Sequence, residues 1–166
     1  MDDWKQVIIK GMMPGALASL ASTGALALRS KQETGSPYSG ANAVSHMVWG
    51  DRAFVHDEPT WKYTLTGYAI HHASSHFWAS IFEQAAGKIF DKPGVASKLA
   101  SAAAASAVAC FVDYKLTPQR LQPGFDVRLS KRSLAMVYGA FAIGLAAGAL
   151  STIATASAAR RRYTSA

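Results

Sequence analysis

The chain has 166 residues, of which 50% are hydrophobic and only 16% are charged, and its formal net charge at pH 7 is +7. This length fits a single domain, and the single cysteine, Cys110, excludes a fold held together by internal disulfide bonds. Since no helix face combines basic with aromatic residues, we expect the basic residues to flank membrane segments, and we expect no nucleic-acid partner.

Polar residues are concentrated between four apolar blocks, each of which can span a membrane once its flanks are included. The sequence therefore predicts an all-α, polytopic membrane protein, a four-helix bundle that forms one integral membrane domain over residues 1–166. A compact soluble helical bundle is the alternative, because a short apolar run can also be a buried core helix. The expected spans are 11–28, 63–83, 97–115 and 133–158.

The first block, 11–28, has no charged residue and carries a small side chain at every fourth position, including Gly11, Gly15 and Ser19. Such a row lets another helix approach closely, so we expect helix packing here. A cleaved signal peptide is the alternative, because 25–27 has the small-x-small pattern of a cleavage site. Acidic residues near the N-terminus offset the basic ones, which argues against a positively charged leader.

The connection 29–62 is polar but rich in aromatic residues. Ser36, which precedes a proline, is a good helix start and Gly50 is a good stop, so we expect a short amphipathic helix between them. Its apolar face suits a position in the membrane interface, with Trp49 as the anchor. His46 lies on its polar face, either as an ordinary exposed histidine or as a group folded over the second span.

The second block, 63–83, is apolar but contains three histidines and ends in a glutamate. In a helix, His72, His76 and Glu83 fall on one face, and His71 points about 100° away from it. Ionisable groups at membrane depth are costly when they face lipid. We therefore expect this polar face to pack against the other helices.

The third block, 97–115, is mostly alanine and serine, and such small side chains suit a helix that is tightly packed in a bundle. Asp113 lies near its end. We expect its carboxylate to pair with Lys115 or Arg120, to reach the lipid headgroups, or to contribute to a polar site.

The fourth block, 133–158, is the longest apolar stretch, and Ala140, Gly144 and Gly148 repeat the row of small residues seen in the first block. The seventeen basic residues of the chain are divided almost evenly between the two sides of the expected membrane. The positive-inside rule therefore gives no orientation.

The chain resembles small four-span bacterial inner-membrane proteins of the YagU type in three segments, SHMVWGDRA, GYAIHHASSHFWASIFE and VDYKLTPQRLQPGF. The resemblance covers most of the chain in the order and hydropathy of its segments. It implies a multi-pass protein of the bacterial plasma (inner) membrane, and it implies no activity and no functional residue.

Histidines of the second span indicate one possible function, a site for a transition metal or haem. His72 and His76, one helical turn apart, can bind one metal ion from a single face, and Glu83 or His46 can add a ligand. Neutral imidazole also suits the axial ligation of haem.

Two other functions fit the same residues. The one that we favour is a non-enzymatic accessory or binding protein, in which the histidines hydrogen-bond to hydroxyl groups such as Ser19, Thr23 or Ser101. The other is passage of protons or small solutes through an oligomer, because histidine titrates near neutral pH. Expected partners are the lipid bilayer and either further copies of the chain or other membrane protein subunits. HExxH, GxSxG and glycine-rich phosphate-loop motifs are absent from the sequence, so catalysis is not favoured.

Overall fold

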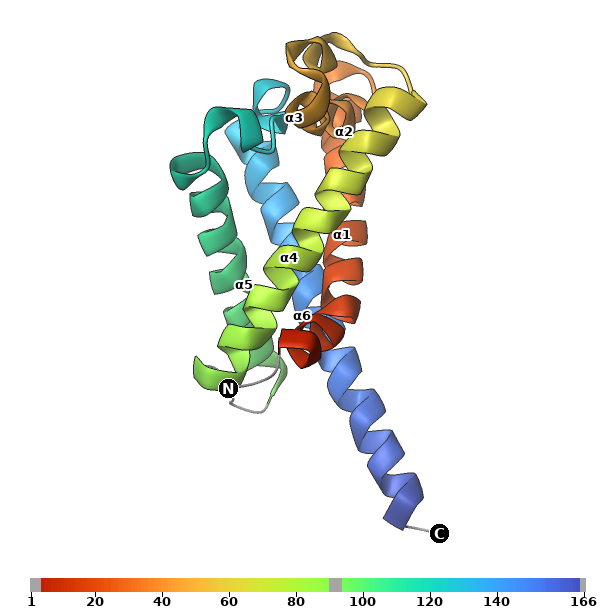
Figure 1. Cartoon of the computed structure of the whole chain (residues 1–166), viewed down its shortest axis with the longest axis vertical. Helices are drawn as coiled ribbons and strands as arrows, with labels where there is room; N and C mark the ends of the chain where they lie inside the picture. The colour runs from red at the N-terminus through yellow and green to blue at the C-terminus, as the bar shows by residue number, and fades with distance from the viewer. Residues whose placement is uncertain (1–3, 90–93, 165–166) are drawn as a thin grey trace.

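The computed structural model describes residues 4–89 and 94–164, and within them the chain is all-helical and contains no β-strand (Figure 1). Long helices run alternately up and down between two ends, so that the start of α1 and the end of α6 lie at the same end (Figure 1). These long helices are α1 (Trp4–Thr34), α4 (Thr66–Ile89), α5 (Val95–Phe111) and α6 (Lys131–Thr164).

Two connections, 35–65 and 112–130, cover the opposite end of the long helices (Figure 1). The first contains α2 (Ser39–Val44), α3 (His46–Trp49), the 3₁₀ turn η1 (Asp51–Val55) and the π-helical turn η2 (Trp61–Leu65). The second contains the π-helical turn η3 (Val112–Leu116), which continues α5, and the 3₁₀ turns η4 (Gln119–Leu121) and η5 (Phe125–Val127). An ion pair between Arg128 and Asp57, with an N–O distance of 2.6 Å, joins the two connections.

Three helical segments are long and apolar enough to cross a membrane, namely Trp4–Thr34, Val95–Leu116 and Lys131–Thr152. They coincide with three of the four expected spans, which fits the expected membrane protein. The other expected span, 63–83, falls in η2 and α4. With 24 residues α4 is long enough to cross, but it is not among these apolar helices, and its three histidines lower its hydropathy. Crossing of the bilayer by α4 therefore stays a prediction.

Many small and polar side chains lie between the helices, whereas many large apolar side chains point outward. Ser19, Ser22 and Ser101 are at most 1% exposed, but Phe77 and Ile143 are 60% and 64% exposed. A protein folded in water keeps extended apolar surface of this kind small. The distribution fits an outer surface that is covered by lipid.

Glycines of α6 let this helix approach α1 closely. A Cβ atom on Gly144 would lie 2.5 Å from the Cα atom of Ala18, and one on Gly148 would lie 2.3 Å from the Cα atom of Pro14. Both distances are too short for a side chain, so the absence of side chains at these two positions sets the spacing of the two helices. Ala140, one turn earlier on α6, is partly buried.

The row of small residues on α1 faces α4 instead of α6. A Cβ atom on Gly11 would lie 3.1 Å from the hydroxyl oxygen of Ser80, and one on Gly15 would lie 2.5 Å from Nδ1 of His76. Because α1 presents one small face to α4 and a second to α6, it packs closely against both helices.

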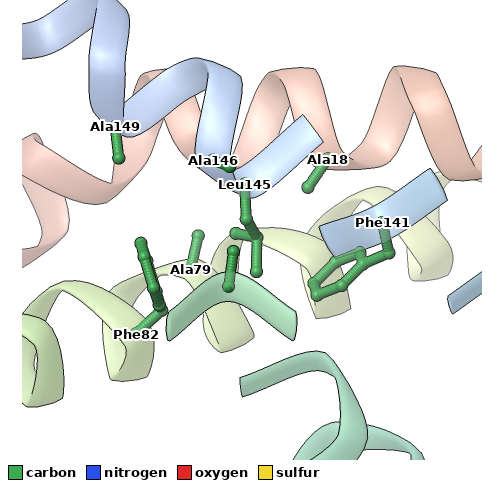
Figure 2. Close-up of a cluster of buried hydrophobic side chains, with 8 residues drawn as sticks. Ala18, Ala79, Phe82, Phe141, Leu145, Ala146 and Ala149 are labelled. Atoms are coloured by element: carbon green, nitrogen blue, oxygen red, sulfur yellow. The ribbon is translucent and has the colours of Figure 1, made fainter. Parts of the chain in front are cut away.

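Alanines dominate the apolar core that the long helices share (Figure 2). Its large buried members are Phe82 of α4 and Phe141 and Leu145 of α6. Its small members are Ala18, Ala79, Ala102, Ala146 and Ala149. With so few large side chains, the helices in this region can lie close together.

The expected amphipathic helix between Ser36 and Gly50 is divided into two short helices, of which α2 is largely buried and α3 exposes Val48 and Trp49. They meet at Ser45, whose hydroxyl donates to the carbonyl oxygen of Asn42 at 2.7 Å and so competes with a continuous helix. Asn42 is fully buried, and its amide nitrogen donates to the carbonyl oxygens of His56 and Glu58 at 2.9 and 3.0 Å. A buried amide needs such partners, and these bonds hold distant parts of the connection together. Trp49, the expected anchor, is exposed.

α5 packs along α6 but diverges from α4. The two helices approach each other at the end that holds the start of α1, and they separate toward the two connections (Figure 1). Residues of α4, α5, α6 and the second connection line a common cavity.

Candidate functional site

His72 and His76 lie on the face of α4 that packs against α1. Nδ1 of His72 is 2.9 Å from the hydroxyl oxygen of Ser19, and its Nε2 is 3.1 Å from Nε2 of His76. The two rings meet edge to face, with their centroids 4.6 Å apart. These three residues form one hydrogen-bonded chain in the α1–α4 interface, and Ser19 is among the hydroxyl partners expected from the sequence.

The four residues expected to bind a metal are not brought together. The Nε2 atoms of His72 and His76 are 3.1 Å apart, close to the separation of about 3.3 Å for two imidazoles on one tetrahedral zinc ion. Glu83, however, lies two turns further along α4, about 10 Å from His76 along the helix axis. His46 lies in α3, where its Nδ1 is 2.9 Å from the carbonyl oxygen of Ala43. Within the residues that the structure describes, no three His, Cys, Asp or Glu side chains form a group that could hold a metal ion.

His71 points to a different side of α4, as the helical spacing predicts. Its Nε2 is 2.8 Å from the hydroxyl oxygen of Ser22 on α1. The hydroxyl of Ser22 donates its proton to the carbonyl oxygen of Ala18 at 2.7 Å, so its oxygen accepts the hydrogen bond from His71. This pattern assigns the proton of neutral His71 to Nε2 and makes Nδ1 a hydrogen-bond acceptor.

A cavity of about 70 Å³ lies beside His71, and we call it the His71 cavity. This volume holds several water molecules or part of a small organic molecule. Its walls come from α1, α2, α3, α4, α6, the end of α5 and the second connection, and most of the lining is apolar. The polar side chains that line it are Ser22, His71, Ser74, Ser75, Asp113 and Tyr138, together with the indole of Trp78.

Asp113 lines this cavity from η3. In η3 the amide of Thr117 donates to the carbonyl of Val112 at 2.9 Å, a spacing of five residues that defines a π-helical turn and is often found at functional sites. A carboxylate oxygen of Asp113 accepts a hydrogen bond from the Tyr138 hydroxyl at 2.6 Å, and the indole of Trp78 also donates to this carboxylate. Asp113 is therefore held by donors from α6 and α4.

The structure bears on two of the three roles expected for Asp113, the ion pair and the polar site. In the part of the chain that it describes, ion pairs involve other carboxylates, and Asp113 pairs with neither Lys115 nor Arg120. Its contacts with Tyr138 and Trp78 make it a member of a polar site instead.

The contacts among Asp113, Tyr138 and Trp78 have no signal in the sequence. These residues lie on three different helical segments, and no motif or spacing relates them. An acidic residue at the end of an apolar block was visible as unusual, but its neighbours depend on how α4, α5 and α6 are placed.

The His71 cavity combines an apolar lining with two ionisable side chains, His71 and Asp113, and neither Lys nor Arg is among the described residues that line it. A mostly apolar cavity with a few convergent polar groups is typical of a small-molecule site.

No protein family, no curated protein and no solved structure matches this chain, so the resemblance to the YagU-type proteins stays a prediction.

Proposed function

We propose that this protein is a non-enzymatic binding protein of the membrane and that a small molecule occupies the His71 cavity. One observation carries the proposal, namely that His71 of α4 and Asp113 of η3 line the same apolar cavity. Ionisable side chains at membrane depth are rare because they are costly, and they usually belong to a functional site.

The setting that we propose is the bacterial inner membrane, with α4 as the fourth span of a four-helix bundle. Outward apolar side chains such as Phe77 of α4 and Ile143 of α6 support contact with lipid. The histidines of α4 turn toward α1 and the cavity, which lets the helix cross without presenting their hydrogen-bonding groups to lipid. Ser74 is exposed on α4 and also lines the cavity, so a ligand can enter from the lipid side.

A pair of alanines on α5 tests the proposal. Ala109 is 1% exposed and lines the cavity, whereas Ala107 is exposed on the same helix. Ala109→Phe fills the cavity, and Ala107→Phe adds the same ring to the outer surface. The wild type and both variants, each in lipid nanodiscs, are titrated with benzyl alcohol, benzylammonium and benzoate, and binding is measured by ligand-detected NMR.

Binding of at least one probe to the wild type and to Ala107→Phe, and its loss in Ala109→Phe, supports the proposal. If each probe gives the same signal with all three proteins, the probes only partition into lipid and the proposal is wrong. Absence of binding to the wild type by all three probes also contradicts it.

Proton passage through an oligomer is the second candidate, and the hydrogen-bonded chain of Ser19, His72 and His76 favours it. Imidazoles linked in this way can pass protons near neutral pH. Proteoliposomes that contain a pH-sensitive dye test this function. We expect faster proton leak with the wild type than with His72→Ala, and equal leak from both contradicts the proposal.

Binding of a transition metal or haem by His72 and His76 stays a prediction. Elemental mass spectrometry of protein purified from metal-supplied cells tests it. Near-stoichiometric iron, zinc or copper that is lost in His72→Ala/His76→Ala supports the prediction, and a metal content that is the same in the double variant contradicts it.

A further inference from the structure

We propose that the ligand of the His71 cavity is a lipophilic monovalent cation, an ammonium group on a small apolar body. This inference rests on the proposed function and adds the chemical class of the ligand. Charge, hydrogen bonding, aromatic lining and access from lipid each support it.

Charge is the first argument. Asp113 lines the cavity, yet its protein partners, Tyr138 and Trp78, are neutral donors. A carboxylate has about four acceptor sites, and these two donors leave some of them free. Even a partly buried charge such as that of Asp113 is costly without a counter-charge, and no Lys or Arg is among the described residues around the cavity. A bound monovalent cation would supply the counter-charge.

The hydrogen-bonding capacity of His71 and Asp113 also favours a cationic ligand. The hydroxyl oxygen of Ser22 accepts a hydrogen bond from Nε2–H of neutral His71, which leaves Nδ1 as an acceptor. The carboxylate of Asp113 is also an acceptor. A ligand between two acceptors needs donors, and an ammonium group has three donors and no acceptor. A carbonyl or carboxylate ligand would instead place its lone pairs against those of the protein.

The aromatic rings that line the cavity also favour a cationic ligand. Trp78, Tyr138, Phe125 and Phe141 all line the cavity. Aromatic faces attract cations, and sets of such rings recognise ammonium groups in other proteins. The same rings suit an apolar body attached to the cation.

Access from lipid selects a lipophilic cation over a hydrated metal ion. Two lining residues are exposed, Leu121 on the second connection and Ser74 on the side of α4 that carries outward apolar residues such as Phe77, so we infer an opening toward lipid beside Ser74. A molecule with an apolar body concentrates in the bilayer beside this opening, whereas a small hydrated ion does not.

The experiment compares three probes that share one ring but differ in charge. Wild-type protein and Asp113→Asn, in nanodiscs of zwitterionic lipid, are titrated with benzylammonium, benzyl alcohol and benzoate. Asparagine keeps an oxygen that can accept from Tyr138, so the variant preserves the shape of the site. Thermal unfolding of the variant checks that it is folded, and Ala109→Phe serves as the blocked-cavity control.

We expect benzylammonium to bind the wild type at least about tenfold more tightly than benzyl alcohol, and benzoate to bind most weakly. Asp113→Asn should remove this preference while benzyl alcohol still binds. The charge preference of the wild type is decisive even if the variant does not fold. If benzyl alcohol or benzoate binds as tightly as benzylammonium, the assignment of a cation is wrong. The proposed binding function still holds in that case, provided that Ala109→Phe blocks the binding. If Ala109→Phe does not block the binding of any probe, both the cation assignment and the proposed binding function are wrong.

Discussion

The two sides of α4 place the same type of side chain in different surroundings. On the side that faces α1, His72 and His76 are closely packed, and Gly15 leaves the space that the His76 ring occupies. On the other side, His71 still reaches α1 through its one hydroxyl partner, Ser22, but it borders a cavity.

The difference comes from the neighbours of α4 and not from the histidines. α1 has small residues that let α4 approach, so polar groups in that interface find partners directly. α5 diverges from α4, so the polar side chains between these two helices are not all in direct contact with one another. A polar side chain in a membrane helix therefore indicates a ligand site only when the packing around it is incomplete.

The largest expected effect tests the closely packed side. Gly144→Leu places a side chain where even a Cβ atom would be 2.5 Å from the Cα of Ala18. We expect a loss of stability at or above the upper end of the usual range for overpacking, about 1–3 kcal/mol, measured as thermal unfolding in detergent. Gly139→Leu is the control, because nothing lies within 4 Å of a Cβ atom there. An equal loss in the two variants would show that α1 and α6 are not in close contact.

The second prediction concerns the cavity side. Tyr138→Phe removes the hydroxyl that donates to Asp113 at 2.6 Å, and we expect a loss of about 1.5 kcal/mol because the acceptor is ionisable and lies between helices. The same change in an Asp113→Asn background should cost less, since a neutral amide is a weaker acceptor than a carboxylate. A double-mutant cycle measures this difference. Additive losses would mean that the two side chains do not interact.

Two serines of α1 allow a direct comparison of the two sides of α4. Ser19→Ala removes the partner of His72, and Ser22→Ala removes the partner of His71. Each should cost about 0.6 kcal/mol, the average for such bonds between membrane helices. We expect only Ser22→Ala to change the affinity for benzylammonium, measured by ligand-detected NMR. The same change in affinity with Ser19→Ala would remove the distinction between the two sides.

The smallest effect is expected at the end of α1, outside both sides of α4. There the carboxylate of Glu33 accepts hydrogen bonds from the amide and hydroxyl of Ser130 and from the hydroxyl of Ser133, and it pairs with Arg29. Because this group is at the surface, we expect Glu33→Gln to lower the unfolding temperature slightly, and less so at high salt. A decrease as large as that of Gly144→Leu would contradict this ranking.

Local sequence patterns predicted the helices and the directions of their side chains. Uncharged stretches marked the three apolar helices, and helical spacing separated His71 from His72 and His76. These features depend on the hydropathy and the 3.6-residue repeat of one segment, which the sequence contains in full. The break at Ser45 was not predicted, because a serine hydroxyl inside a helical stretch can either donate to a nearby backbone carbonyl, as Ser45 does to Asn42, or point outward, and the sequence pattern does not distinguish the two.

Tertiary structure alone decided which polar groups meet. Asp113 was visible in the sequence as an acidic residue at the end of an apolar block, but its partners Tyr138 and Trp78 were not. The cavity exists because α5 follows α6 away from α4, and this divergence results from the packing of all the long helices together. Hydropathy and periodicity describe one helix at a time, whereas a site between helices depends on their separation, and that separation is set by contacts between residues far apart in the chain.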